Sequence, residues 1–129
     1  MIPLPDDIQL RFEDRPGYLH ASVSGPRDSQ QISLTYWAHI AEEVRRRRAG
    51  RLLVEENLGD HEGDRDLPGL VEAVVAMGLD RVQVAFVVNR VDLLAQMEYG
   101  EILAMEQGAN GRVFASVATA EQWLRHGGG

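Results

Sequence analysis

The spacing of apolar and polar residues divides the chain into short segments of two kinds. Apolar residues at every second position predict two half-buried strands, residues 8–12 and 18–25. The stretch 14–17 between them favours a tight turn, because Pro16 fixes its own φ angle and Gly17 tolerates a positive one. The first part of the chain is therefore predicted to be an antiparallel hairpin.

Helical patterns then alternate with apolar runs. After a loop at residues 25–29, the apolar residues of 34–44 recur at helical spacing and predict a helix that ends in four arginines, with Gly50 as its C-cap. Residues 52–54 are continuously apolar, which is typical of a buried strand. An acidic loop over residues 59–66 is predicted to follow this strand.

The second half of the chain continues this alternation. A helix is predicted over residues 67–77, and an interior strand over 82–88, because an almost wholly apolar strand is typical of one covered on both faces. Residues 91–107 favour a helix with a kink or a break at Gly100. The final strand is expected over residues 112–117.

The end of the chain completes the predicted domain. Residues 119–122 form a capping box that starts a last short helix. Residues 1–126 are expected to form one domain and residues 127–129 a flexible tail. The predicted fold class is α/β: an N-terminal antiparallel hairpin followed by successive strand-helix units in a largely parallel sheet, with about five strands and four helices.

Composition narrows the functional classes. Of 129 residues, 44% are hydrophobic and 26% are charged, as in a soluble globular protein. The net charge of −7 argues against general nucleic-acid binding. The absence of cysteine removes thiolate catalysis and cysteine-bound metals, and it fits a cytoplasmic location. No apolar run approaches about 20 residues, so stable membrane insertion is not expected.

The order of the predicted elements resembles the SpoIIAA-like family, small relatives of STAS domains and of anti-sigma-factor antagonists. The resemblance covers nearly the whole chain and rests on the order and spacing of core and turn residues. It implies a curved, largely parallel sheet and a non-catalytic role, such as binding partner proteins or regulating transport. The same general fold occurs in lipid-binding modules of the Sec14 type. The matching stretches are residues 16–18, 23–25, 51–54, 81–87, 112–114 and 120–124.

The chain departs from the antagonist pattern at the regulatory position. The resemblance implies a switch that works by phosphorylation of a serine at the start of the helix after the central strand. No serine or threonine occurs here between Thr35 and Ser116. Phosphorylation of this segment by a serine/threonine kinase is therefore not expected.

The carboxyl ends of the parallel strands are the expected place for a ligand. We expect Glu55, Glu56 and Asn57 to meet Asn89 and Arg90 there. Adjacent side chains of a strand point to opposite faces, so the two glutamates are not expected to share a substrate. An ion pair between a glutamate and Arg90 is favoured over catalysis at this edge.

Metal and cofactor sites find little support in the sequence. Asp60, Glu62, Asp64 and Asp66 alternate as in a calcium loop, but Arg65 replaces the required glycine. The four histidines lack zinc-ligand spacing, and the glycines lack the spacing of a phosphate-binding loop. No cofactor and no metal are predicted.

Residues 93–105 carry more apolar surface than one helix face can bury. Methionine and aromatic side chains, here Met97, Tyr99 and Met105, suit adaptable contact surfaces. Core packing is the structural alternative for this segment. The functional alternatives are a groove for a partner helix, for a second copy of the chain, or for a small apolar ligand.

The sequence thus favours a non-enzymatic regulatory or protein-interaction module of the STAS-like type. Its partner would be another protein or, as a homodimer, a second copy of the chain. The first alternative is a carrier or sensor of a small apolar ligand or lipid, held between the sheet and residues 93–105. An enzyme that uses Glu55 or Glu56 is a distant third.

Overall fold

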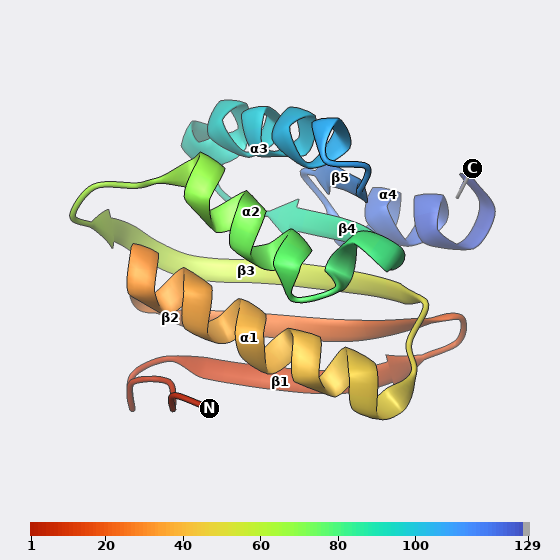
Figure 1. Ribbon diagram of the computed structural model, residues 1–129, viewed down its shortest axis with the longest axis horizontal. Coiled ribbons are helices and arrows are strands. Elements are labelled where there is room, and N and C mark those ends of the chain that lie inside the picture. Colours follow the sequence, from red (N-terminus) through yellow and green to blue (C-terminus); the bar gives the residue numbers. More distant parts are fainter. Residues whose placement is uncertain (128–129) are drawn as a thin grey trace.

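The computed structural model describes residues 1–127 and contains a five-stranded sheet in the order β1-β2-β3-β4-β5 (Figure 1). The first two strands pair antiparallel, and each later strand is parallel to its neighbour. The predicted hairpin followed by strand-helix units is therefore confirmed. The strands are β1 (Gln9–Arg15), β2 (Tyr18–Ser29), β3 (Arg51–Glu62), β4 (Gln83–Val88) and β5 (Asn110–Phe114).

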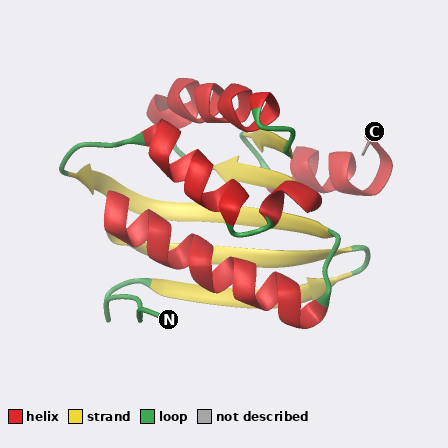
Figure 2. Ribbon diagram, in the orientation of Figure 1, coloured by secondary structure: helices red, strands yellow, loops and turns green. Residues whose placement is uncertain are grey.

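Helices cover both faces of the sheet (Figure 2). The helices α1 (Gln30–Arg47), α2 (Leu67–Ala76) and α3 (Leu94–Glu106) share one face. Parallel crossovers are right-handed and each adds the next strand on the same side, which places their helices on one face. The last helix, α4 (Val117–Gln122), packs with η3 (Trp123–Gly127) on the other face, and two short turns, η1 (Leu79–Arg81) and η2 (Val91–Leu93), precede β4 and α3.

The alternation of side chains along the central strands divides the core in two. Leu52 and Val54 of β3 pack toward α1, α2 and α3, whereas Leu53 packs toward α4 together with Ala85 and Val87 of β4. All five of these side chains are completely buried. Strand β4 is thus covered on both faces, as its apolar composition predicts.

The pairing of β2 with β3 is longer than the sequence indicates. The predicted loops at residues 25–29 and 59–66 are wrong in part, because β2 continues to Ser29 and β3 to Glu62 in parallel register. A Cβ atom at Gly59 would lie 2.0 Å from the carbonyl oxygen of Pro26, so glycine allows the two backbones to approach here. Both segments are polar and show no apolar strand pattern. The sequence therefore did not predict this pairing, because it depends on backbone hydrogen bonds and not on apolar side chains.

Two helix ends also differ from the prediction. Helix α1 ends at Arg47, and Arg48 takes the left-handed cap conformation with φ 54°, so Gly50 is not the cap. Helix α4 starts after Ser116, whose hydroxyl accepts a hydrogen bond from the Thr119 N–H, so the predicted capping box at Thr119 is wrong. The second error arises because Ser116 and Thr119 are both good N-cap residues and lie close together in the sequence.

Of the predicted kink or break at Gly100, the break is wrong, since α3 is one helix from Leu94 to Glu106. Gly100 lies against Leu67 of α2, and a Cβ atom there would be 3.6 Å from the Leu67 side chain. Packing against α2 thus offsets the low helix propensity of glycine. Of the predicted tail, Gly127 closes η3, and residues 128–129 lie outside the described residues.

The close approach at Gly59 predicts a selective effect of substitution. Gly59→Ala is expected to lower the free energy of unfolding by about 2 kcal/mol, because its Cβ atom must displace the backbone at Pro26. Gly50→Ala is the matched control, since no atom lies within 4 Å of a Cβ there, and a change below about 0.5 kcal/mol is expected. Urea denaturation of both variants measures the difference, and equal stabilities would contradict the β2–β3 contact.

Candidate functional site

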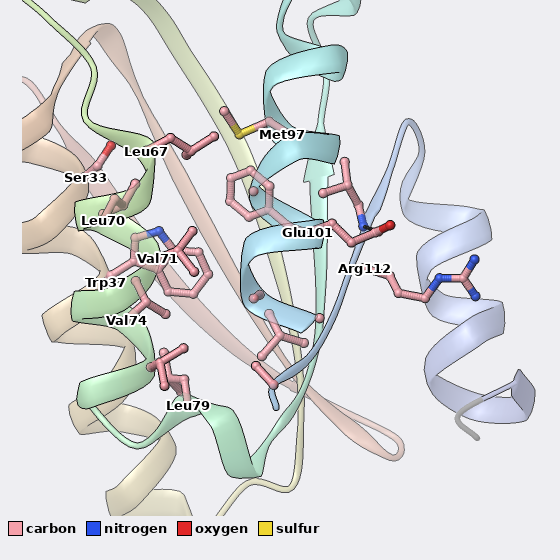
Figure 3. Close-up of a pocket in the computed structure, with 18 of the residues that line it drawn as sticks. Ser33, Trp37, Leu67, Leu70, Val71, Val74, Leu79, Met97, Glu101 and Arg112 are labelled. Carbon is pink, nitrogen blue, oxygen red and sulfur yellow. Dashed lines mark hydrogen bonds between the residues drawn. The ribbon is translucent and has the colours of Figure 1, made fainter. Parts of the chain in front are cut away.

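A mainly apolar cavity of about 130 Å³ lies between α2, α3 and the sheet (Figure 3). Leu67, Leu70, Val71 and Val74 of α2 form one wall, and Met97 of α3 lies near one end. Val84 and Phe86 of β4 and Val113 of β5 form the side of the cavity that belongs to the sheet. Arg112 contributes to the lining, but its side chain extends away from the cavity toward α4, where its guanidinium lies 5.8 Å from the Trp123 ring centre.

Small residues occupy part of the cavity lining. Gly100 and Ala104 line it from α3 together with Met97 and Glu101, and Gly111 lines it from β5. Large side chains line it as well: the Trp37 ring stacks on Phe86 with 5.8 Å between ring centres. A protein interior is normally close-packed, so a cavity at this place is a local departure from ordinary packing.

One end of the cavity carries a buried carboxyl and two hydroxyl groups, and Glu101, Asn110 and Arg112 also contribute polar groups to the lining. Glu56, the last paired residue between β3 and β4, lines the cavity with only 6% of its surface exposed. The Tyr36 hydroxyl of α1 donates a hydrogen bond to Glu56 Oε2 at 3.3 Å. Ser33, one turn earlier on α1, also lines the cavity and donates to Asp28 Oδ1 at 3.0 Å. A carboxyl group and two hydroxyl-bearing side chains therefore adjoin an apolar space.

Burial changes the acid-base properties of this polar end. Burial, and next the negative charge of Asp28, raise the pKa of Glu56 to about 7. Burial first, and then Glu56 and Asp28, raise the pKa of Tyr36 well above 10, so Tyr36 stays a hydrogen-bond donor at neutral pH. Glu56 thus changes its charge near neutral pH, which distinguishes it from an ordinary surface glutamate.

Glu55 lies on the opposite face of the sheet from Glu56. Its Oε1 atom is 3.1 Å from Nε2 of His20, a buried residue of β2 whose Nδ1 atom has no hydrogen-bond partner in the described chain. The two glutamates are separated by the sheet, as strand alternation predicts. They do not form an acid-base couple on one substrate.

Of the other residues predicted at the carboxyl edge, Asn57 and Asn89 are exposed and bind one another, whereas Arg90 is half-buried and binds two aspartates. Asn89 donates a side-chain hydrogen bond to Asn57. Arg90 forms ion pairs with Asp60 at 2.8 Å and with Asp92 at 2.9 Å. The predicted ion pair between a glutamate and Arg90 is wrong, because the longer β3 brings Asp60 within reach instead.

The acidic residues of the end of β3 and of the loop after it have separate structural roles. Asp60 pairs with Arg90, Glu62 pairs with Arg27 at 3.1 Å, and Asp66 caps α2 by accepting a hydrogen bond from the Gly69 N–H. Within residues 1–127 no group of three or more acidic or histidine side chains is placed to hold a metal ion.

The predicted contact residues of α3 divide between its two sides. Met97 is buried and lines the cavity, whereas Tyr99 and Met105 are exposed on the outer side with Ile102. Residues 93–105 therefore provide both a cavity wall and an exposed apolar stripe.

Sequence analysis missed Asp28, Ser33 and Tyr36. Asp28 was assigned to a loop, and the burial of the other two was not expected for polar groups. The available signal was that Ser33 and Tyr36 share one side of α1 with buried Ile40, at helical spacing.

No protein-family model matches this chain, and no curated protein matches it either. Among the described residues, no helix is long and apolar enough to cross a membrane.

The raised pKa of Glu56 predicts a pH-dependent stability. Between the ordinary value of 4.5 and the folded value of about 7, the folded protein holds a proton that the unfolded chain has lost. The free energy of unfolding therefore falls as pH rises through this range, by about 3 kcal/mol from Glu56 alone. The glutamine side chain in Glu56→Gln cannot ionise. The free energy of unfolding of this variant, relative to that of the wild type, is therefore expected to be higher at about pH 8 than at about pH 5.

Denaturation of both proteins at the two pH values tests this expectation. Tyr36→Phe is the control: it keeps the buried carboxyl, so the pH trend of the wild type is expected to persist. A difference between Glu56→Gln and wild type that does not change with pH would contradict a raised pKa.

Proposed function

We propose that this protein is a non-enzymatic module that binds a small, mainly apolar ligand in the cavity between α2, α3 and the sheet, as a carrier or a sensor. The observation that carries the proposal is the cavity itself, a mainly apolar space that remains partly open, since Val71, Val74 and Phe86 in its lining are only half-buried. A concave, mainly apolar space with a few polar groups is the usual form of a small-ligand site. The buried carboxyl of Glu56 gives this apolar space one polar end. Such a combination orients a ligand.

The volume limits the ligand to about one ring or a short branched chain. A cavity of about 150 Å³ holds a benzene molecule, whereas sites for larger ligands are about 300 to 1,000 Å³. At about 130 Å³, the present cavity accepts a compact group, and a longer ligand would have to extend out of it.

The resemblance to SpoIIAA-like and STAS-like proteins supports a role in binding or regulation. It remains part of this proposal, as does the lipid-binding use of the same general fold. The confirmed order of a hairpin and successive parallel strand-helix units is compatible with that assignment.

Filling the cavity is expected to remove ligand binding. Ala104 lines the cavity on α3, so Ala104→Leu places a larger side chain where the ligand would lie. Ethylbenzene is the probe, and NMR titration of the Met97 methyl and Trp37 indole signals measures its binding. The affinity is expected to fall at least about tenfold in the variant.

Ala95→Leu is the matched control, since Ala95 is exposed on the same helix and does not line the cavity. It is expected to bind ethylbenzene as the wild type does. A folded wild-type protein whose Met97 and Trp37 signals do not respond to ethylbenzene would overturn the proposed function.

A second candidate function is protein interaction through the outer side of α3. Tyr99, Ile102 and Met105 recur at every third position and are each at least half exposed, so they form one apolar stripe. Exposed large apolar side chains that cluster in this way are typical of contact surfaces. A second copy of this chain is the occupant that the experiment below tests.

Self-association is expected to depend on this stripe. The mean mass of the wild type in light scattering is expected to rise from monomer toward dimer as concentration increases. Ile102→Glu places a charge in the centre of the stripe and is expected to abolish the rise, whereas Glu98→Gln, also exposed on α3, is not. A wild-type monomer at all concentrations would exclude a homodimer through α3.

A further inference from the structure

We propose that the ligand of the cavity is a small amine, with an apolar body of about one ring whose ammonium group binds the Glu56 carboxylate. This inference rests on the proposed function and adds the chemical class of the ligand. It depends on the hydrogen-bonding groups, the charges and the size of the site.

Glu56 presents a carboxyl oxygen that can accept a ligand donor. Its Oε2 accepts from Tyr36, and its Oε1 has no hydrogen bond within residues 1–127. Asp28 does not line the cavity itself, but its Oδ1 accepts from the lining residue Ser33 at 3.0 Å and from the Ser29 N–H at 2.7 Å. A ligand that brings a donor can therefore bind the second oxygen of Glu56.

The charges favour a cation over an anion. Asp28 and Glu56 lie on neighbouring strands, and both are almost completely buried. Arg65 is the cation that lines this end of the cavity, but it is partly exposed and forms no ion pair in the described chain, so its head group can remain in water. A ligand ammonium would supply up to three donors and a positive charge next to Glu56.

The acid-base behaviour of the site agrees with this assignment. Burial and the charge of Asp28 raise the pKa of Glu56, and neither Arg65 nor Arg90 fully offsets them. A bound ammonium next to the carboxylate would lower that pKa again, because an opposite charge favours the ionised form. Amine binding is therefore expected to release a proton near neutral pH.

The experiment compares four probes of nearly the same size: ethylbenzene, benzyl alcohol, benzylamine and benzoate. Each is titrated by NMR into the wild type and into Glu56→Gln at about pH 8, where Glu56 is ionised. Benzylamine is expected to bind the wild type at least about tenfold more tightly than ethylbenzene, because the charged hydrogen bond adds to the apolar contact. In Glu56→Gln this preference is expected to disappear.

Two further measurements sharpen the test. Glu98→Gln, on the exposed side of α3, is expected to keep the amine preference. Lowering the pH to about 5.5 is expected to weaken benzylamine binding to the wild type, as Glu56 takes up a proton. The charged and titratable groups that act on Glu56 are Asp28 of β2, Tyr36 of α1, Arg65 and Arg90.

The outcomes separate this inference from the proposed function. Ethylbenzene binding without an amine preference, or an amine preference that survives in Glu56→Gln, would overturn the inference and leave the cavity as an apolar ligand site. Tighter binding of benzoate than of benzylamine would overturn it in favour of anion recognition by Arg65. If none of the probes binds the folded wild type, both proposals are wrong.

Discussion

Parallel hydrogen bonding between β2 and β3 is the constraint on which the rest of the structure depends. It runs from Leu19 and Leu52 at one end to Ser29 and Glu62 at the other. The far part of this pairing, which the close contact at Gly59 permits, changes Asp28 from a loop residue into a buried strand residue. Helix α1 begins directly after β2 and carries Ser33 and Tyr36 to the same place. The polar end of the cavity is therefore a consequence of how far two strands remain paired.

Two departures from ordinary packing meet at this end of the sheet. The first is the cavity, where Gly100 and Ala104 leave space between α2, α3 and Phe86. The second is the buried carboxyl of Glu56, whose ionised form has lost most of its contact with water. A filled core without this glutamate would avoid both. Their coincidence supports a binding role, because proteins tend to break the rules of packing and polar burial where they have a function.

The sheet places functional side chains that are neighbours in the sequence on its two opposite faces. Glu55 and Glu56 are neighbours along β3, yet one contacts His20 on the α4 side and the other adjoins the cavity on the opposite side. Helix α3 divides its residues in the same way, with Met97 inside and Met105 outside. Both divisions follow from the geometry of a single element: two-residue alternation in a strand and 3.6-residue spacing in a helix.

The sequence by itself determined the α/β class, the order of the elements and the opposite directions of Glu55 and Glu56, because these depend on local periodicity. Turn residues and the apolar run of β4 were sufficient for the hairpin and for a strand covered on both faces. Only the tertiary structure decided the length of the β2–β3 pairing, the continuity of α3 through Gly100 and the place of the cavity. These features depend on contacts between segments far apart in the chain: Gly59 against Pro26, Gly100 against Leu67 and Tyr36 against Glu56. A polar segment is predicted to be a loop, but it forms a strand when a second strand bonds to its backbone. A glycine is predicted to break a helix, but the helix continues when another helix packs against it.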